Sequence, residues 1–321
     1  MDFLANYFSS LNPMSFLSAL PGNIAQGIIW GLMGLGVFLT FKLLNFADLS
    51  VDGSFATGGA VTAVMLINDC PVWATIIVAI LAGLAAGLVT GLLHTLLGIP
   101  DILAGILTQI ALYSINLNIM GKSNLPISYR NYTLVVSASN INMAILVGLG
   151  ICAVVVAAMY WYFGTEQGST IRSTGSNPAM SKAQGININF TKVIALALSN
   201  GLVALSGSLF AQYQGFADIN MGRGAIVIGL AAVIIGEVLG EAIFRKHMNF
   251  IIRMLFVIVG GILYYIAMGI VLWLKMPTDD TKLFTAIIVA IFLAVPYLQK
   301  KRKTSFKKVA KMNAKNAQKE G

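Results

Sequence analysis

The amino-acid sequence predicts an all-α, polytopic membrane protein with about nine transmembrane helices. Of the 321 residues, 57% are hydrophobic and only 10% are charged, and the mean hydropathy is +0.82. A soluble domain carries about 25% charged residues, so this composition excludes an ordinary soluble globular protein, a disordered chain and a disulfide-rich scaffold. The 32 glycines also fit, because glycine lets membrane helices pack closely.

Nine apolar segments approach the length of about 20 residues that a helix needs to span a bilayer. They lie near 22–44, 46–67, 71–97, 100–121, 141–163, 191–215, 222–243, 250–273 and 282–299. The charge-free cores of the second and seventh segments are short, so these two could be broken or half helices, and the count is eight to ten. Residues 1–21 are amphipathic and are expected on the membrane surface, with a partial extra span as the alternative.

The basic residues predict the orientation of the chain. Residues 300–321 hold nine Lys and Arg residues and one acid, Glu320. Placing this tail in the cytoplasm puts sixteen basic residues inside and five outside, as the positive-inside rule requires, and leaves the N-terminus outside. Without the tail the bias is only seven against five. We interpret the tail as a cytoplasmic anchor rather than a nucleic-acid arm, so no nucleic-acid partner is expected.

Two short segments suggest an internal repeat. Residues 46–53 read FADLSVDG, and residues 216–223 read FADINMGR. In the orientation above, the first lies at the cytoplasmic face and the second at the outer face. This change of side is typical of inverted repeats in transporters, although so short a match could also recur by chance. The repeat predicts one transmembrane domain, 1–299, with inverted halves near 22–163 and 191–299.

The longest polar interruption expected on the cytoplasmic side is residues 164–191. Asn177-Pro178 signals a helix start, because Asn caps helix N-termini and Pro suits the first helical position. A short helix should therefore run from Pro178 to Gln184 and stop at Gly185. Its small residues would let another protein approach closely; the plainer alternative is a structured loop.

Two acidic residues occur near the start of the second segment, where an ionisable group is costly and usually faces protein or water. Asp48 and Asp52 are four positions apart, so in a helix they share one face. They could line a solute path or tie down a broken helix. We favour a structural role at the cytoplasmic end, where Asp48 caps the helix and pairs with Lys42.

A polar stripe follows one face of the fourth segment, formed by Gln109, Tyr113 and Asn116. Such a stripe makes hydrogen bonds between helices more often than it lines a solute path. The full set of candidate path residues comprises Asn45, Asp48, Ser50, Asp52, Gln109, Tyr113 and Asn116.

Charged residues near the ends of other segments also have expected roles. Glu241 precedes Arg245 by four positions, which predicts an ion pair, whereas Glu237 lies one turn deeper and could meet the machinery that drives transport. Three cations expected outside could contact acidic groups of a partner protein: Arg130, Arg223 and Lys275.

The cytoplasmic segment Ile171–Asn189 resembles the coupling region of permeases from the branched-chain amino acid and ribose class of ABC importers. The pattern of that family is approximately R-x-x-G-x-N-x-x-x-A-x-x-x-G-I. The matching positions are Arg172, Gly175, Asn177, Gly185 and Ile186, and Ser181 stands at the place of the usual alanine. Residues 44–47 (LNFA), 48–51 (DLSV) and 229–237 (GLAAVIIGE) also resemble family segments. Asp52 and Glu237 depart from its pattern. The likeness spans about 22–299 and is closest to a subgroup assigned to tryptophan or tyrosine uptake.

This resemblance implies the permease subunit of an ATP-driven importer in the bacterial plasma membrane. Its expected partners are a cytoplasmic ABC ATPase dimer, an extracellular or periplasmic substrate-binding protein and a second permease copy, with a homodimer favoured. The solute is expected to be an amino acid, with an aromatic one as the narrower expectation. The coupling residues would be Arg172, Gly175, Asn177, Pro178, Ala179, Ser181, Lys182, Gly185 and Ile186.

Two other functional classes are weighed against this interpretation. A self-sufficient secondary transporter or channel would also have inverted repeats and broken helices, but it has no need to shape residues 164–191 for an ATPase. A membrane-embedded enzyme is disfavoured because no HExxH, GxSxG or P-loop pattern is present. The two histidines and two cysteines form no metal-binding pattern. We therefore expect no catalytic activity, cofactor or metal site in this chain.

Overall fold

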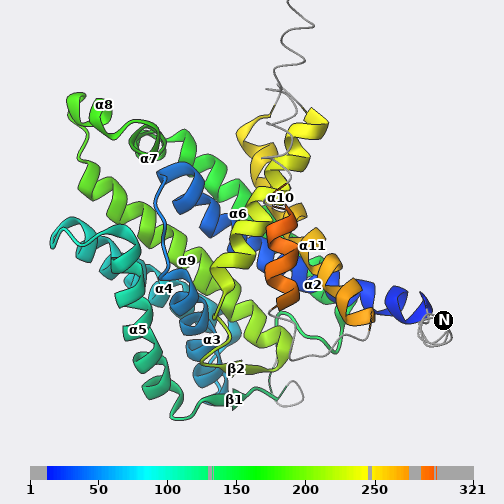
Figure 1. Ribbon diagram of the computed structural model, residues 1–321. Coiled ribbons are helices and arrows are strands. Elements are labelled where there is room, and N and C mark those ends of the chain that lie inside the picture. Colours follow the sequence, from blue (N-terminus) through cyan, green and yellow to red (C-terminus); the bar gives the residue numbers. More distant parts are fainter. Residues whose placement is uncertain are drawn as a thin grey trace, which may run out of the picture. The chain divides into compact units, whose positions relative to one another are not determined.

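The computed structural model describes residues 13–128, 132, 134–244, 248–274, 283–292 and 294. These residues are almost entirely helical, with two short strands (Figure 1). The chain separates into two units, 1–275 and 276–321. In the second unit the structure describes one short apolar helix, Leu283–Phe292, and the predicted tail at 300–321 lies outside the described residues.

The first unit contains helices that begin and end at the local signals the sequence carries. Pro71 directly precedes α4 and Pro100 directly precedes α5, while Gly121 ends α5 and Gly215 ends α9 in the left-handed conformation. The elements are α2 (Pro13–Val37), the π-helix η1 (Phe38–Leu44), α3 (Val51–Ile67), α4 (Val72–Thr95), α5 (Asp101–Met120), β1 (Asn124–Pro126), α6 (Ile141–Gly164), α7 (Glu166–Ser176), α8 (Pro178–Ala183), α9 (Ile188–Gln214), β2 (Phe216–Asp218), α10 (Ala225–Phe244) and α11 (Phe250–Trp273).

Seven helices in the described part of the chain are long and apolar enough to cross a membrane. They match the first predicted segment and the third to eighth. The second predicted segment forms α3, which has only 17 residues, and the described part of the ninth forms only Leu283–Phe292. A helical polytopic membrane protein is therefore confirmed, while the count of nine stays a prediction.

The first helix begins earlier than the sequence analysis expected. Residues 13–21 continue directly into the first span, and the apolar stretch runs from Met14 to Leu44. Residues 13–21 are therefore helical and continuous with the first span, their place at the membrane surface stays a prediction, and residues 1–12 lie outside the described part. Pro21 lies inside α2 and removes one backbone donor, but it does not end the helix, because membrane helices tolerate proline where the freed groups find other partners.

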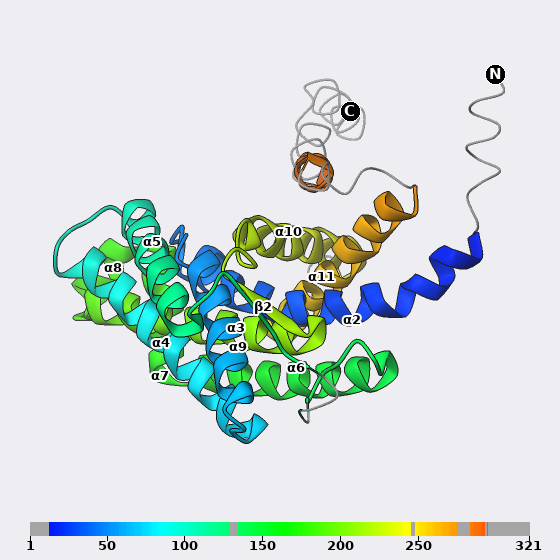
Figure 2. The same ribbon diagram turned by 90° about the horizontal axis from the view of Figure 1, so that it is seen from below.

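Helix α9 lies at the centre of the unit, and Figure 2 shows α4 and α5 on one side of it and α10 and α11 on the other. α2 runs antiparallel to α9: Ser206 donates to the Ile29 carbonyl and Ser199 donates to the Gly36 carbonyl, both at 2.7 Å. Because these buried hydroxyls bond directly to a neighbouring backbone, they hold the two helices close together.

Helix α3 starts at the middle of this bundle rather than at one end. After η1, Asn45 adopts the left-handed conformation with φ 56°, and the chain turns back toward the interior. Ser54 donates to the amide oxygen of Asn200 at 2.6 Å, and the Ser50 hydroxyl oxygen lies 3.1 Å from the same amide oxygen. Asn200 lies near the midpoint of α9. α3 then follows α9 in the same direction, so it is a half helix in position as well as in length.

Helix α10 starts at the same level as α3. The carboxylate of Asp52 accepts hydrogen bonds from the backbone N–H groups of Gly224 at 2.9 Å and Ile226 at 2.8 Å. A carboxylate at a helix N-terminus satisfies free donors and complements the helix dipole. α10 then runs in the direction opposite to α3. The evidence is that Glu237 of α10 lies 2.8 Å from Lys42 in η1. The two helices thus leave one level in opposite directions, and the origin of the halves in an inverted repeat stays a prediction.

Two opposite ends of the bundle are marked by different elements. β1 and β2 form an antiparallel pair, with Leu125 opposite Ala217, at one end. α7 and α8 lie at the other end (Figure 1). The β1–β2 end and the α7–α8 end therefore correspond to the two membrane faces that the sequence predicts as outer and cytoplasmic; their sidedness stays a prediction.

The interface between α3 and α9 depends on backbone contact. A Cβ atom on Gly207 would overlap the Phe55 carbonyl oxygen, and one on Gly58 would overlap the Ala204 carbonyl oxygen. Glycine at these positions lets the two backbones touch. Next to this contact, Trp30 of α2 stacks on Phe55 with ring centroids 4.7 Å apart, so α2, α3 and α9 share one packed core.

Candidate functional site

Helix α8 forms where the sequence predicts it. The side-chain oxygen of Asn177 accepts a hydrogen bond from the Met180 backbone N–H at 3.1 Å, and Pro178 occupies the first turn. The helix ends at Ala183, one residue before the predicted Gln184, and Gly185 follows with φ 82°. The predicted helix and both of its end signals are confirmed.

Helix α7 was not predicted from the sequence. Residues 166–176 were expected to be a loop, but they form three turns of helix capped by the Thr165 hydroxyl. Arg172 donates to the Phe163 carbonyl at 2.9 Å, and a Cβ on Gly175 would overlap the Leu43 carbonyl oxygen. These two family-pattern residues therefore fix α7 to the ends of α6 and η1, although Arg172 is also exposed.

The residues of α8 divide into an inward and an outward set. Ser181 is 2% exposed, and its hydroxyl donates to the Asn177 carbonyl at 3.1 Å. The expectation that Ser181 offers a partner a small side chain is therefore wrong, since the residue faces its own chain. Met180 is 58% exposed, and the other outward residues are Asn177, Pro178, Ala179, Lys182, Ala183, Gln184 and Gly185, with Ile186 half-buried.

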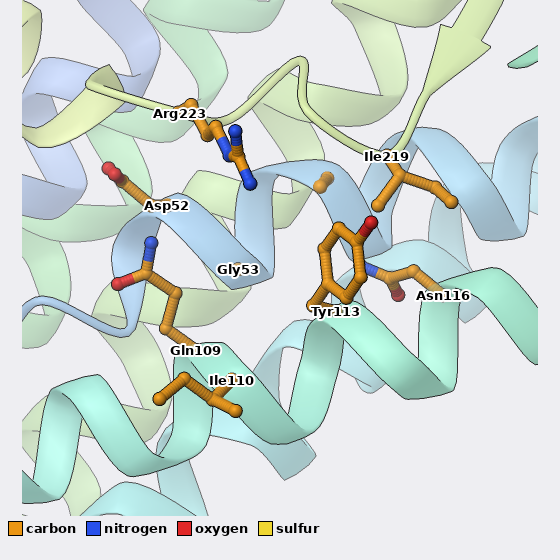
Figure 3. Close-up of a pocket in the computed structure, with 9 residues that line it drawn as sticks. Asp52, Gly53, Gln109, Ile110, Tyr113, Asn116, Ile219 and Arg223 are labelled. Atoms are coloured by element: carbon orange, nitrogen blue, oxygen red, sulfur yellow. The ribbon is translucent and has the colours of Figure 1, made fainter. Parts of the chain in front are cut away.

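A second polar region lies where α3, α5 and the start of α10 meet. A cavity of about 340 Å³ is lined by Asp52, Gly53, Ala56, Gln109, Ile110, Tyr113, Asn116, Ile219 and Arg223 (Figure 3). It therefore brings together four of the candidate path residues: Asp52, Gln109, Tyr113 and Asn116. Asn45, Asp48 and Ser50 do not line this cavity.

The cavity combines a cation with polar groups and an aromatic ring. In Figure 3 the guanidinium of Arg223 and the ring of Tyr113 both point toward the space between α3 and α5. Asn116 is 1% exposed, and within the described residues neither its amide nitrogen nor its amide oxygen has a hydrogen-bond partner. A buried amide without partners is costly, so this side chain is suited to bonding something that enters the cavity.

Asp48 belongs to a buried network and not to the predicted pair with Lys42. Its carboxylate accepts from the Ser50 backbone N–H at 2.9 Å, from the Ser50 hydroxyl at 2.5 Å and from the Asn200 amide at 2.7 Å. The predicted pairing was wrong because the turn at Asn45 directs Asp48 into the bundle. Asp48 and Ser50 therefore hold the half helix α3 against the middle of α9, which agrees with the alternative of tying down a broken helix and not with the favoured role at the cytoplasmic end.

Glu237 also has partners that the sequence analysis did not foresee. It lies 2.8 Å from Lys42 and 3.5 Å from Arg253, so it links η1, α10 and α11 within this chain. Glu237 was expected as a possible contact for the machinery that drives transport. In the structure it instead forms ion pairs with two cations of its own chain. The predicted partner of Glu241, Arg245, lies outside the described residues.

Two functional positions were missed or assigned differently. Asn200 joins α3 to α9, and its polar side chain within a 27-residue apolar helix was the available signal. Arg223 was expected on a docking surface; it is exposed and also lines the cavity, so its docking role stays a prediction. The other two cations predicted for docking, Arg130 and Lys275, lie outside the described residues.

Comparisons with known proteins agree with this geometry. Residues 22–296 match the family model described as branched-chain amino acid transport system / permease component. The tyrosine transport system permease protein of Clostridioides difficile strain R20291 is 42% identical over 93% of this chain and 99% of its own length. The D-allose transport system permease protein AlsC of Escherichia coli K12 is 26% identical over 80% of this chain and 77% of its own length.

A solved structure, PsaBC from Streptococcus pneumoniae in complex with Fab, aligns with a TM-score of 0.51 at 16% identity. The alignment covers 91% of this chain and 94% of that chain, and at this identity it supports the fold alone. The relatives are named as permeases of transport systems and not as enzymes. By its family match and its helical membrane fold, the chain belongs to the permease components of branched-chain amino acid type transport systems.

Proposed function

We propose that this permease is the translocation subunit of an ATP-driven importer of amino acids with aromatic side chains. The observation that carries this proposal is the α7–α8 unit, which is fixed to the membrane helices by Arg172 and Gly175 and presents an exposed short helix. The name of the 42% identical relative, a tyrosine transport permease, supports the solute class.

In this proposal a cytoplasmic ATPase dimer binds α8. Ala179, Lys182 and Gly185 lie on its exposed side, and the small residues allow close approach of a groove. α8 passes into α9 through Gly185–Asn187, and the Asn187 side chain caps α9 by accepting from the Phe190 N–H at 3.1 Å. A movement of α8 would thereby reach the centre of the bundle. The ATPase shifts the permease between outward- and inward-open states only through contacts that differ between those states.

The cavity beside α5 is the proposed path for the solute. Arg223 would bind the carboxylate of an amino acid through charge-assisted hydrogen bonds, and the oxygens of Asp52 and Gln109 would accept from its ammonium group. Tyr113 offers a ring for an aromatic side chain. Ile110 and Tyr113 are 62% and 45% exposed on this side, and we assign the open side to a second permease copy.

Replacement of Arg223 by glutamine is expected to lower tyrosine uptake by about tenfold to a hundredfold, because a charge-assisted hydrogen bond contributes about 1.5–3 kcal/mol. The measurement is initial uptake at several solute concentrations, with co-purification of the ATPase measured in parallel. Lys122→Gln is the matched control, since it removes an exposed cation that does not line the cavity. Equal uptake by both variants would remove Arg223 from the path.

The function itself is tested by co-expression with the neighbouring ATPase and binding protein, followed by purification and reconstitution into vesicles. Uptake of labelled tyrosine should require ATP hydrolysis, the ATPase and the binding protein. Uptake by the permease alone, driven by an ion gradient and insensitive to ATP, would instead establish the secondary-transporter alternative. The ligand retained by the purified binding protein identifies the solute directly.

A further inference from the structure

A group of cations gathers where the spans end near α7, and it has no part in the proposed solute path. Lys42 lies at the end of the first span, Arg172 follows α6, and Arg253 lies in the first turn of α11. All three line one cavity of about 320 Å³ together with Phe38, Leu43, Ser176, Met248 and Phe250. Lys42 and Arg253 lie at the ends of predicted spans, and Arg172 bonds to Phe163 at the end of a third, so the group belongs at the level of lipid headgroups.

The cations are incompletely neutralised. Glu237 contacts Lys42 at 2.8 Å and Arg253 at 3.5 Å, whereas Arg172 bonds to the Phe163 carbonyl and lies 5.8 Å from the centre of the Phe250 ring. Three cations with one acid leave two positive charges uncompensated among these residues. Lys42 and Arg253 are also 40% and 38% exposed, so an anion can reach them.

Arg172 connects this cavity to a second one on the surface of α6. That cavity, about 500 Å³, is lined by Tyr160, Trp161, Phe163, Gly164, Thr165, Arg172 and Phe250. Trp161 and Tyr160 are 74% and 53% exposed. Exposed Trp and Tyr at the end of a membrane helix are typical of the headgroup level of a bilayer.

An apolar groove continues from the same aromatic residues toward the middle of the bundle. It has a volume of about 320 Å³ and shares Trp161 and Phe163 with the cavity above. The remaining lining residues come from η1, α4, α6 and α9: Leu39, Ile80, Leu84, Val155, Ala158, Met159, Tyr162, Leu198, Gly201, Leu202 and Leu205. The charged cavity and the apolar groove thus each share lining residues with the cavity on α6, an arrangement that fits a molecule with an anionic head and a hydrocarbon chain.

We propose that an anionic phospholipid binds this permease, with its phosphate at Arg172, Lys42 and Arg253 and an acyl chain in the groove beside Trp161. Basic pockets at the ends of membrane helices recognise lipid headgroups in this way. The apolar groove favours a lipid over a free phosphate as the ligand, because a free phosphate has no hydrocarbon chain to fill the groove. The bound lipid would contact α7, and through it the segment that leads to α8.

The test measures lipid binding to the full-length purified permease by native mass spectrometry. Dioleoylphosphatidylglycerol should bind more tightly than dioleoylphosphatidylcholine, and Arg172→Gln should weaken the phosphatidylglycerol complex about fivefold, as loss of one cation near a headgroup predicts. Ala158→Trp should weaken it as well by filling the groove without changing any charge. Lys122→Gln, which removes a cation at the opposite end, should bind like the wild type.

Two competing outcomes would overturn the proposal. Displacement of the lipid by inorganic phosphate at equal concentration, with Ala158→Trp unchanged, would indicate a simple anion site. Equal binding of both lipids, together with loss of ATPase co-purification in Arg172→Gln, would assign the cations to a protein contact. Because Arg172 also supports α7, Ala158→Trp keeps the test decisive if Arg172→Gln fails to fold.

Discussion

Replacement of Ala179 by glutamate is expected to abolish transport while the permease still inserts into the membrane and keeps the oligomeric state of the wild type. Ala179 is exposed on α8, so the change disturbs no contact within the chain. Burying an unpaired carboxylate in a partner's groove costs several kcal/mol, which is more than about a hundredfold in association. The measurements are ATP-dependent uptake and co-purification of the ATPase with the variant.

The matched control is Ala138→Glu, which places the same charge on an exposed alanine outside α7 and α8. This variant should retain ATPase co-purification at the wild-type level. Gly185→Pro should impair transport like Ala179→Glu, because proline fixes φ near −65° and Gly185 requires φ 82°. Wild-type uptake and ATPase association in Ala179→Glu would show that α8 is not the coupling element and would favour a secondary transporter.

Replacement of Gly207 by valine is expected to prevent accumulation of folded permease. A Cβ atom at this position overlaps the Phe55 carbonyl oxygen, so α3 and α9 would have to separate along their common contact. Overpacking of a tight core costs about 1–3 kcal/mol and occasionally more, and a backbone neighbour cannot relax as a flexible side chain does. We expect an effect above that range, measured as the yield of monodisperse protein in detergent and its thermal unfolding temperature.

Gly150→Val serves as the control, because no neighbouring atom lies within 4 Å of a Cβ built on this α6 glycine. Its yield and unfolding temperature should stay close to those of the wild type. If Gly207→Val also behaves like the wild type, the close contact between α3 and α9 does not hold the bundle together.

Local signals made the helices predictable, because hydropathy, prolines and glycines act within a few residues. Asn177, Pro178 and Gly185 defined α8 to within one residue, and the short charge-free core at 53–68 correctly marked α3 as unusual. Each signal has a physical effect that does not depend on the rest of the fold, such as a capped N–H group or a left-handed turn.

Other features depended on contacts between distant parts of the chain. The sequence of α7, EQGSTIRSTGS, is polar and has weak helix propensity, and it is held by Arg172 and Gly175 against α6 and η1. Likewise Lys42 was matched with the nearby Asp48, whereas the fold gives it Glu237, 195 positions away. Proximity in sequence could not reveal these pairings, since they join residues of different helices, and the turn at Asn45 takes Asp48 away from Lys42.

Among the candidate path residues, the shared face of those on a regular helix could be predicted from the sequence. Gln109, Tyr113 and Asn116 share one face of α5 by simple periodicity, and the structure places all three at the cavity. Asn45 and Ser50 lie in or beside an irregular segment, where periodicity gives no direction. Arg223 follows β2 in another irregular stretch, so only the folded chain shows that it lies beside Asp52.

The length of α9 has a mechanical consequence. Its 27 residues contain no proline, so it forms a stiff rod about 40 Å long. If α9 tilted by about 5° about its end next to α8, its far end, next to β2, would move by roughly 3.5 Å. α9 is clamped along its length by α2, α3 and α4, so such a tilt would carry these neighbours with it. These four helices are therefore expected to move as one block. We expect the transport path to open and close where this block slides past the other helices.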